Sequence, residues 1–149
     1  MKLSTRSRYG VRIIMDLSIH SSHAPVRMQD IAMRQGISMK YIEQLIIPLK
    51  KAGYVTSIRG PKGGYRLNKS PEKIAMGEIV NILEGGLTLS ECLEKPEKCD
   101  RYENCLTRHI WEKATKAMLS ELNSVSLAEM MHSTDYEKVS KKDINCIMP

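Results

Sequence analysis

Residues 28–67 read MQDIAMRQGISMKYIEQLIIPLKKAGYVTSIRGPKGGYRL and carry the clearest signals of secondary structure in the chain. Met28–Gln35 has the length and pattern of a short helix that stops at Gly36, since glycine permits the backbone angles of a tight turn. Ser38 can cap the helix that follows. Apolar residues then recur at the spacing of one helix face: Ile42, Leu45, Ile46 and Leu49. Two helices joined in this way predict a helix-turn-helix.

The end of the same stretch predicts a β-hairpin. Two runs rich in β-branched and aromatic residues, Tyr54–Ile58 and Gly64–Leu67, flank the turn sequence RGPKG at residues 59–63. Taken alone, such a tip is more often a simple hairpin turn. Its place after a helix-turn-helix favours a wing, whose tip can enter the minor groove of DNA or hold phosphate. The glycines do not form a nucleotide-binding P-loop, because the G-x4-G-K-[ST] order is absent.

The N-terminal half is strongly basic. Residues 1–66 hold 12 Lys and Arg against 3 Asp and Glu, whereas residues 67–149 hold 11 against 14. Upstream of the helix-turn-helix, apolar residues repeat every four from Arg6 to about Ser21, which predicts an amphipathic helix. The concentration of positive charge around these elements indicates a nucleic-acid partner.

The outward face of the second helix in the helix-turn-helix carries side chains that can read bases. Gln44 can bond adenine at two points, Glu43 can accept from the cytosine amino group, and Lys40 can reach guanine or a phosphate. Ile47 and Lys51 share this face. The alternative is a polar, solvent-facing surface without base contacts.

Composition predicts one ordinary hydrophobic core. The chain has 149 residues, 42% of them hydrophobic, with no Phe and one Trp, so the core should be aliphatic and rich in methionine. The first residues, MKLSTR, are not an apolar signal segment, and no apolar run approaches the roughly 18 residues needed to span a membrane. We therefore expect a cytoplasmic protein without a membrane partner.

Three cysteines lie in one highly charged segment, with the spacing Cys92-x6-Cys99-x5-Cys105. Seven of the eleven intervening residues are charged, so the segment should be a solvated loop. In a reducing compartment such thiols are ligands or redox sensors rather than structural bridges. Zinc sites usually contain a Cys-x2–4-Cys pair, and neither gap is that short. An iron–sulfur cluster is the main interpretation; zinc, a thiol–disulfide switch and metal-free cysteines stay open.

A long helix is expected from about Glu103 to Leu122. Its apolar stripe predicts a dimer interface, with packing inside one chain as the alternative. The stripe consists of Cys105, Ile110, Ala114, Ala117, Met118 and Leu122. A short helix should begin at Ser126, and residues 132–149 are polar and expected to be a flexible tail.

Several strings together resemble one bacterial family of transcription factors, the IscR/NsrR/CymR regulators. They are STRSRYGVRIIMDL, YIEQLIIPLKKAGYVTSIRGPKGGYRL and AMGEIVNILEG, followed by the three cysteines and CLTRHIW. The likeness extends from Met1 to about Met131. It implies a mainly α fold with a small β-hairpin wing, namely a winged helix-turn-helix plus a long dimerisation helix. It also implies a homodimeric repressor on a roughly palindromic operator in double-stranded DNA.

The resemblance implies a division of the chain and a set of DNA contacts. Residues 1–75 would be the DNA-binding domain. Residues 76–131 would hold a linker helix, a cluster-binding loop at 92–105 and the dimerisation helix, before the tail at 132–149. The expected DNA-contacting residues are Met28, Ser38, Lys40, Tyr41, Glu43, Gln44, Arg59, Gly60 and Lys62.

Cluster-binding members of the family supply three cysteines and a fourth ligand, which implies a cluster here, [2Fe–2S] favoured over [4Fe–4S]. Where such members have histidine three residues after the last cysteine, this chain has Arg108, which cannot ligate. His109, four residues after Cys105, is the tentative substitute, and Cys146 is a second candidate. Other members use a carboxylate at the position of Arg8, so that route is closed. The alternative is a CymR-like, metal-free regulator of cysteine metabolism, controlled by a partner protein or by thiol redox state.

Overall fold

The structure, a computed structural model, describes residues 2–132. In chain order the elements are α1 (Thr5–His20), α2 (Met28–Gln35), α3 (Met39–Lys51), β1 (Val55–Ile58), β2 (Gly64–Leu67), the 3-10 helix η1 (Pro71–Lys73), α4 (Met76–Glu84), α5 (Glu91–Glu94), the 3-10 helix η2 (Pro96–Lys98), α6 (Arg108–Ser124) and α7 (Leu127–His132). The predicted fold class, mainly helical with one small hairpin, is confirmed.

The helices of the N-terminal half begin and end as their sequence predicts. The Ser4 hydroxyl accepts from the Ser7 backbone N–H and caps α1. Gly36 ends α2 with φ 63°, a left-handed conformation that favours glycine. The Ser38 hydroxyl accepts from the Tyr41 N–H and caps α3. The helix-turn-helix is therefore set by one glycine and one serine.

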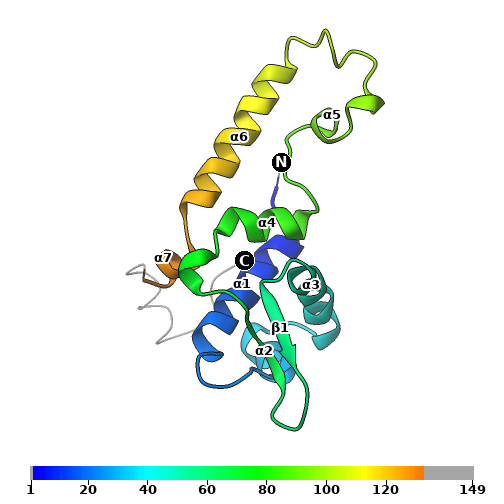
Figure 1. The fold of residues 1–149 in the computed structure, drawn as a ribbon. Coiled ribbons are helices and arrows are strands. Elements are labelled where there is room, and N and C mark those ends of the chain that lie inside the picture. Colours follow the sequence, from blue (N-terminus) through cyan, green and yellow to red (C-terminus); the bar gives the residue numbers. More distant parts are fainter. Residues whose placement is uncertain (1, 133–149) are drawn as a thin grey trace.

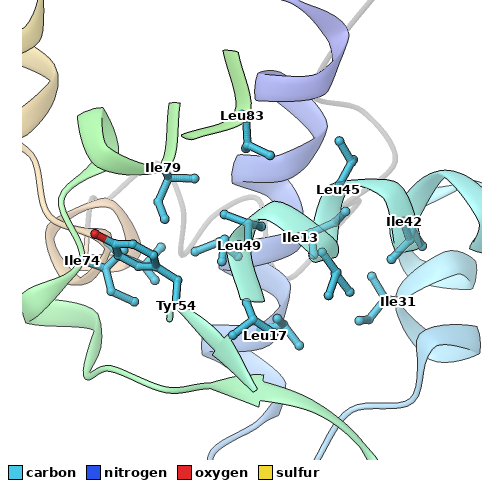
Figure 2. Close-up of a cluster of buried hydrophobic side chains, with 14 of the residues drawn as sticks. Ile13, Leu17, Ile31, Ile42, Leu45, Leu49, Tyr54, Ile74, Ile79 and Leu83 are labelled. Carbon is cyan, nitrogen blue, oxygen red and sulfur yellow. The ribbon is translucent and has the colours of Figure 1, made fainter. Parts of the chain in front are cut away.

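An aliphatic core joins α1, α2, α3 and α4 (Figure 2). Its fully buried side chains include Ile13 and Leu17 from α1 and Leu45 and Leu49 from α3. The predicted richness in methionine is wrong for the buried centre, where Met76 is the methionine present. Four others pack at the margin of the core: Met15, Met28, Met130 and Met131. The branched side chains of Ile and Leu fill the interior instead.

The hairpin is a two-stranded antiparallel sheet that is tied to the helices at its base. Val55 pairs with Leu67 and Ile58 pairs with Gly64. Val26, just before α2, forms a bridge to Tyr65 with backbone N–O distances of 2.8 Å in both directions. This bridge fixes the hairpin against the entry to the helix-turn-helix.

The chain leaves the core after α4 and returns to it at α7. Figure 1 shows α5 and the segment that leads to α6 at the end of the molecule opposite the hairpin tip. Helix α4 lies between this end and the hairpin. After α6 the chain comes back: the Leu127 N–H donates to the Ile74 carbonyl at 2.8 Å, and Leu127 is buried in the core. The short helix predicted from Ser126 is present as α7.

The long helix differs from its prediction in boundary and packing. It begins at Arg108 rather than near Glu103, because residues 99–107 form successive turns; the Tyr102 N–H, for example, donates to the Cys99 carbonyl at 3.0 Å. Cys105 therefore lies outside the helix. Thr115 is the buried residue of α6, whereas Ile110 is 59% exposed. The predicted apolar stripe is thus largely unburied within one chain. The tail from residue 133 lies outside the described residues.

Candidate nucleic-acid interface and cysteine loop

The outward face of α3 is open to solvent. Lys40, Glu43 and Gln44 are all exposed, while the apolar residues on the opposite face anchor the helix in the core. Tyr41 is half-buried, and its ring meets that of Tyr9 edge-on with centroids 6.0 Å apart. Among the predicted DNA contacts on α3, three side chains are therefore available to a ligand and the fourth also supports the helix.

The hairpin tip presents Arg59, Gly60 and Lys62, all exposed. Two residues that the sequence reasoning did not assign hold the hairpin in place. Arg27 donates from Nη2 to the Pro61 carbonyl at 3.1 Å. Lys50 donates from Nζ to the Ser57 hydroxyl at 2.8 Å. The first contact joins residues 34 positions apart and the second joins α3 to β1, so neither follows from the spacing within one element.

The hairpin and α3 belong to one surface. Burial, and secondly the nearby negative charge of Glu43, raise the pKa of Tyr65 on β2. Glu43 on α3 is thus close enough to the hairpin to be felt electrostatically. Met28 at the start of α2 and Ser38 at the cap of α3 lie on the same helix-turn-helix, the first half-buried and the second exposed.

A buried ionic network fastens α1 to α2. The Asp16 carboxylate, 1% exposed, accepts from Arg34 Nε at 2.9 Å and Nη2 at 2.7 Å, and from the Gln35 amide at 2.8 Å. Arg12 in turn donates from Nε to the Gln35 side-chain oxygen at 3.0 Å and from Nη2 to the Gln35 carbonyl at 3.0 Å. The pKa of Arg34 is raised, first by this hydrogen bond to Asp16. The network fixes the angle at which the helix-turn-helix leaves α1.

The three cysteines of the loop are free and half-buried. The Cys92 thiol lies 3.2 Å from the Ser90 hydroxyl. Hydrogen bonding from the Thr107 hydroxyl and then from the Arg108 backbone N–H lowers the pKa of the Cys105 thiol. A lowered pKa favours the thiolate, which is the form that binds metals. Within residues 2–132, however, no three Cys, His, Asp or Glu side chains converge closely enough to hold a metal ion.

Arg108 is engaged in holding the loop to the start of α6. Its guanidinium lies over the Tyr102 ring, 4.3 Å from the centroid, and donates from Nη1 to the Tyr102 carbonyl at 3.0 Å. Neighbouring His109 is exposed, with Nδ1 3.8 Å from a Glu112 oxygen. A helix from about Glu103 would have placed Cys105 and His109 on one face, but α6 begins at Arg108, after Cys105. Cys146 falls outside the described residues.

Helix α4 lies between the helix-turn-helix half and α6, and contacts both. At its C-terminal end, the Glu84 carboxylate accepts from the Ser4 N–H and the Ser7 hydroxyl of α1. Burial opposes ionisation of Glu84, but these hydrogen bonds outweigh it and lower its pKa. At the other end, the Tyr54 hydroxyl donates to Glu78 at 2.7 Å; burial first and this bond second raise the pKa of Tyr54 to about 12.

The sequence model of the family described as Rrf2, iron-dependent transcriptional regulator, matches residues 3–133, nearly the whole chain. The chain belongs to the Rrf2 family. Protein rrf2 of Nitratidesulfovibrio vulgaris strain Hildenborough is 50% identical over 131 residues, which cover 88% of this chain and 87% of that protein.

Solved structures of Rrf2-type regulators share the fold. The T. potens IscR is similar with a TM-score of 0.70 and 40% identity, over 88% of this chain and 86% of that one. CymR (YrzC), the global cysteine regulator of B. subtilis, gives a TM-score of 0.72 and 36% identity, over 91% and 99%. The resemblance to IscR- and CymR-type regulators inferred from sequence is confirmed.

Membership of the Rrf2 family makes the chain a DNA-binding transcriptional regulator with a winged helix-turn-helix; its relatives are regulators, not enzymes. None of the helices in residues 2–132 is both long and apolar enough to cross a membrane. The hairpin made by β1 and β2 stands where a winged helix-turn-helix has its wing, and we call it the wing from here on.

Replacing Arg59 or Lys62 at the wing tip by Ala should weaken binding to every DNA sequence. Each lost phosphate contact makes the negative slope of log K against log salt shallower by about 0.9. Fluorescence anisotropy on operator and unrelated duplexes between low and moderate salt measures this slope. Lys73→Ala, an exposed lysine of η1, is the matched control and should leave it unchanged. An unaltered slope in both wing variants would remove the wing tip from the interface.

Proposed function

We propose that the protein is an iron–sulfur-sensing, sequence-specific transcriptional repressor that binds its operator as a homodimer. Residues 1–75 would bind DNA, with α3 in the major groove and Arg59 in the minor groove. Residues 76–131 would sense and dimerise. The observation that carries the proposal is a charged loop with three free thiols at the end of the molecule opposite the wing, connected to the DNA-binding half through α4.

The donor chemistry of the loop fits an iron–sulfur cluster. Thiolates are the usual ligands of such clusters, and Cys92, Cys99 and Cys105 supply three on one solvated segment. The lowered pKa of Cys105 favours its ligating form. His109, exposed at the start of α6, is the proposed fourth ligand, with Cys146 as second choice. A bound cluster, [2Fe–2S] rather than [4Fe–4S], would supply sensitivity to iron and to oxidants.

The homodimer rests on the unburied apolar side of α6. Ile110 is 59% exposed and Trp111 42%, and Leu106 just before the helix is 88% exposed. Large apolar side chains gathered on one helix mark an interaction surface. A second copy of α6 crossing the first would cover them in a two-fold symmetric contact.

The loop can influence the DNA-binding half through α4 and α1. The Leu89 backbone N–H donates to the Thr115 hydroxyl of α6 at 3.2 Å, so the segment after α4 is held to α6. Leu83 of α4 packs against Gly10 of α1 so closely that any larger residue there would overlap it. A shift of the loop would therefore change the spacing of the two α3 helices in a dimer, which must match half-sites about one DNA turn apart.

Iron and acid-labile sulfide per chain, measured on protein purified without oxygen, test the cluster. We expect about two of each for a [2Fe–2S] cluster. About four of each would retain the sensor and change the cluster type. Neither element after attempted reconstitution would contradict the proposal, and one tightly held zinc without sulfide would indicate a structural metal site instead.

The second candidate function is a metal-free regulator of sulfur metabolism. It is favoured by the similarity to the fold of B. subtilis CymR and by the separation of the three thiols in the described residues. In that case operator binding should respond to a partner protein or to thiol oxidation. Operator affinity that changes on thiol oxidation of iron-free protein, and is restored by a reductant, would support it.

A further inference from the structure

Two large apolar side chains stand on the outward face of α3, where polar residues would be expected. Met39 is 48% exposed and Ile47 is 49% exposed. The other isoleucines and leucines of the helix are at most 1% exposed. These two residues have no role in the core that explains their side-chain type.

Met39 and Ile47 flank Glu43 along the helix. The three residues are spaced by four, so they form one line that drifts by about 40° per step. The line is apolar at both ends and acidic in the middle. None of the three is positively charged, although they belong to a region with 12 Lys and Arg against 3 Asp and Glu; the next residue at this spacing is Lys51.

Positive charge lies at one end of this line and beside it. Lys51, the next residue at the same spacing, ends the line at the C-terminus of α3, Lys40 is exposed beside the line, and Lys50 is bonded to Ser57 of the wing. Lysines at the margins suit the phosphates that border a groove of DNA. The line between them then faces the edges of the base pairs. In the major groove the C5-methyl of thymine is the apolar group on those edges.

We propose that Met39 and Ile47 are specificity-determining residues that contact thymine methyl groups, on either side of the base pair met by Glu43. The inference rests on the proposed placement of α3 in the major groove. It adds a preference that hydrogen-bonding side chains cannot give: a half-site with thymines whose methyl groups, rather than their O4 atoms, are recognised.

Uracil substitution isolates this contact, because it removes the methyl group and leaves base pairing intact. An operator is first selected from random duplexes with the full-length protein in one fixed cluster state. Each thymine of one half-site is then replaced by deoxyuridine, and Kd is measured by fluorescence anisotropy. We expect about a fourfold loss at one or two positions, as for the exposure of one methyl group.

The variants Met39→Ala and Ile47→Ala complete the cycle. Each variant should bind the thymine operator about fourfold more weakly than the unaltered protein. Replacing the thymine that the removed side chain would contact by deoxyuridine should then weaken its binding no further. Met33→Ala is the matched control, since Met33 is an exposed methionine of α2, 76% accessible, away from this line. It should show the same uracil effect as the unaltered protein.

Two results would overturn the inference while operator binding persists. One is equal affinity for thymine and uracil at every position. The other is a uracil effect that survives unchanged in both alanine variants, in which case Met39 and Ile47 would serve another partner. Failure to select any sequence would instead overturn the proposed function. Thermal unfolding checks that the variants are folded, which their exposure leads us to expect.

Discussion

The Asp16→Asn variant should lose about 3 kcal/mol of the free energy of unfolding. The amide keeps the shape of the carboxylate but removes the negative charge that faces Arg34. It also places an N–H donor where Arg34 or Gln35 already donates. The guanidinium, with 25% of its side chain exposed, then keeps a partly buried charge without compensation. Urea denaturation followed by circular dichroism measures the loss.

Asp30→Asn is the matched control for this prediction. Asp30 lies in the first turn of α2, and its charge also raises the pKa of Arg34, after three larger causes. At a helix N-terminus a carboxylate is worth at most about 1 kcal/mol. We expect the control to lose no more than that. Equal losses in the two variants would mean that the buried network does not fasten α1 to α2.

Replacing any one of Cys92, Cys99 and Cys105 by Ala should reduce bound iron from about two per chain to nearly none. Each thiolate supplies one attachment of the cluster, and loss of an attachment in a solvated loop leaves iron open to solvent. None of the three lies in the core, so circular dichroism should show unchanged helix content. Full iron loading in any of these variants would exclude that cysteine as a ligand.

The fourth ligand is decided by the same assay. His109→Ala should lose iron or shift the visible absorption of the cluster, because imidazole and water differ as ligands. Cys146→Ala should match the unaltered protein. The opposite pattern, with iron lost in the Cys146 variant and kept in the His109 variant, would reassign the ligand to the tail.

Local signals made much of the DNA-binding half predictable. Gly36 and Ser38 fix the turn and cap by chemistry within a few residues, and the helix-turn-helix follows from them. The wing followed from two short β-rich runs around a glycine-rich turn. These elements need no information from distant parts of the chain.

Contacts between distant residues were the part that the sequence could not supply. Asp16 is the one acidic residue of α1, and its partner Arg34 lies 18 residues away. The bond from Arg27 to Pro61 in the wing joins residues 34 positions apart and has no signature in the sequence. The sequence predicted that the long helix begins near Glu103, because the pattern of charged and apolar residues is continuous from there. In the structure α6 begins at Arg108, and the bond from Arg108 to the Tyr102 carbonyl stabilises the turns before it.

Control of DNA binding by the cysteine loop is the core of the proposed function. Its most direct test is the Kd for a selected operator, measured without oxygen on cluster-loaded protein and on the same preparation after the iron is removed by a chelator. We expect the two Kd values to differ at least fivefold, the lower end of ordinary allosteric coupling. Equal Kd values in the two states would contradict it.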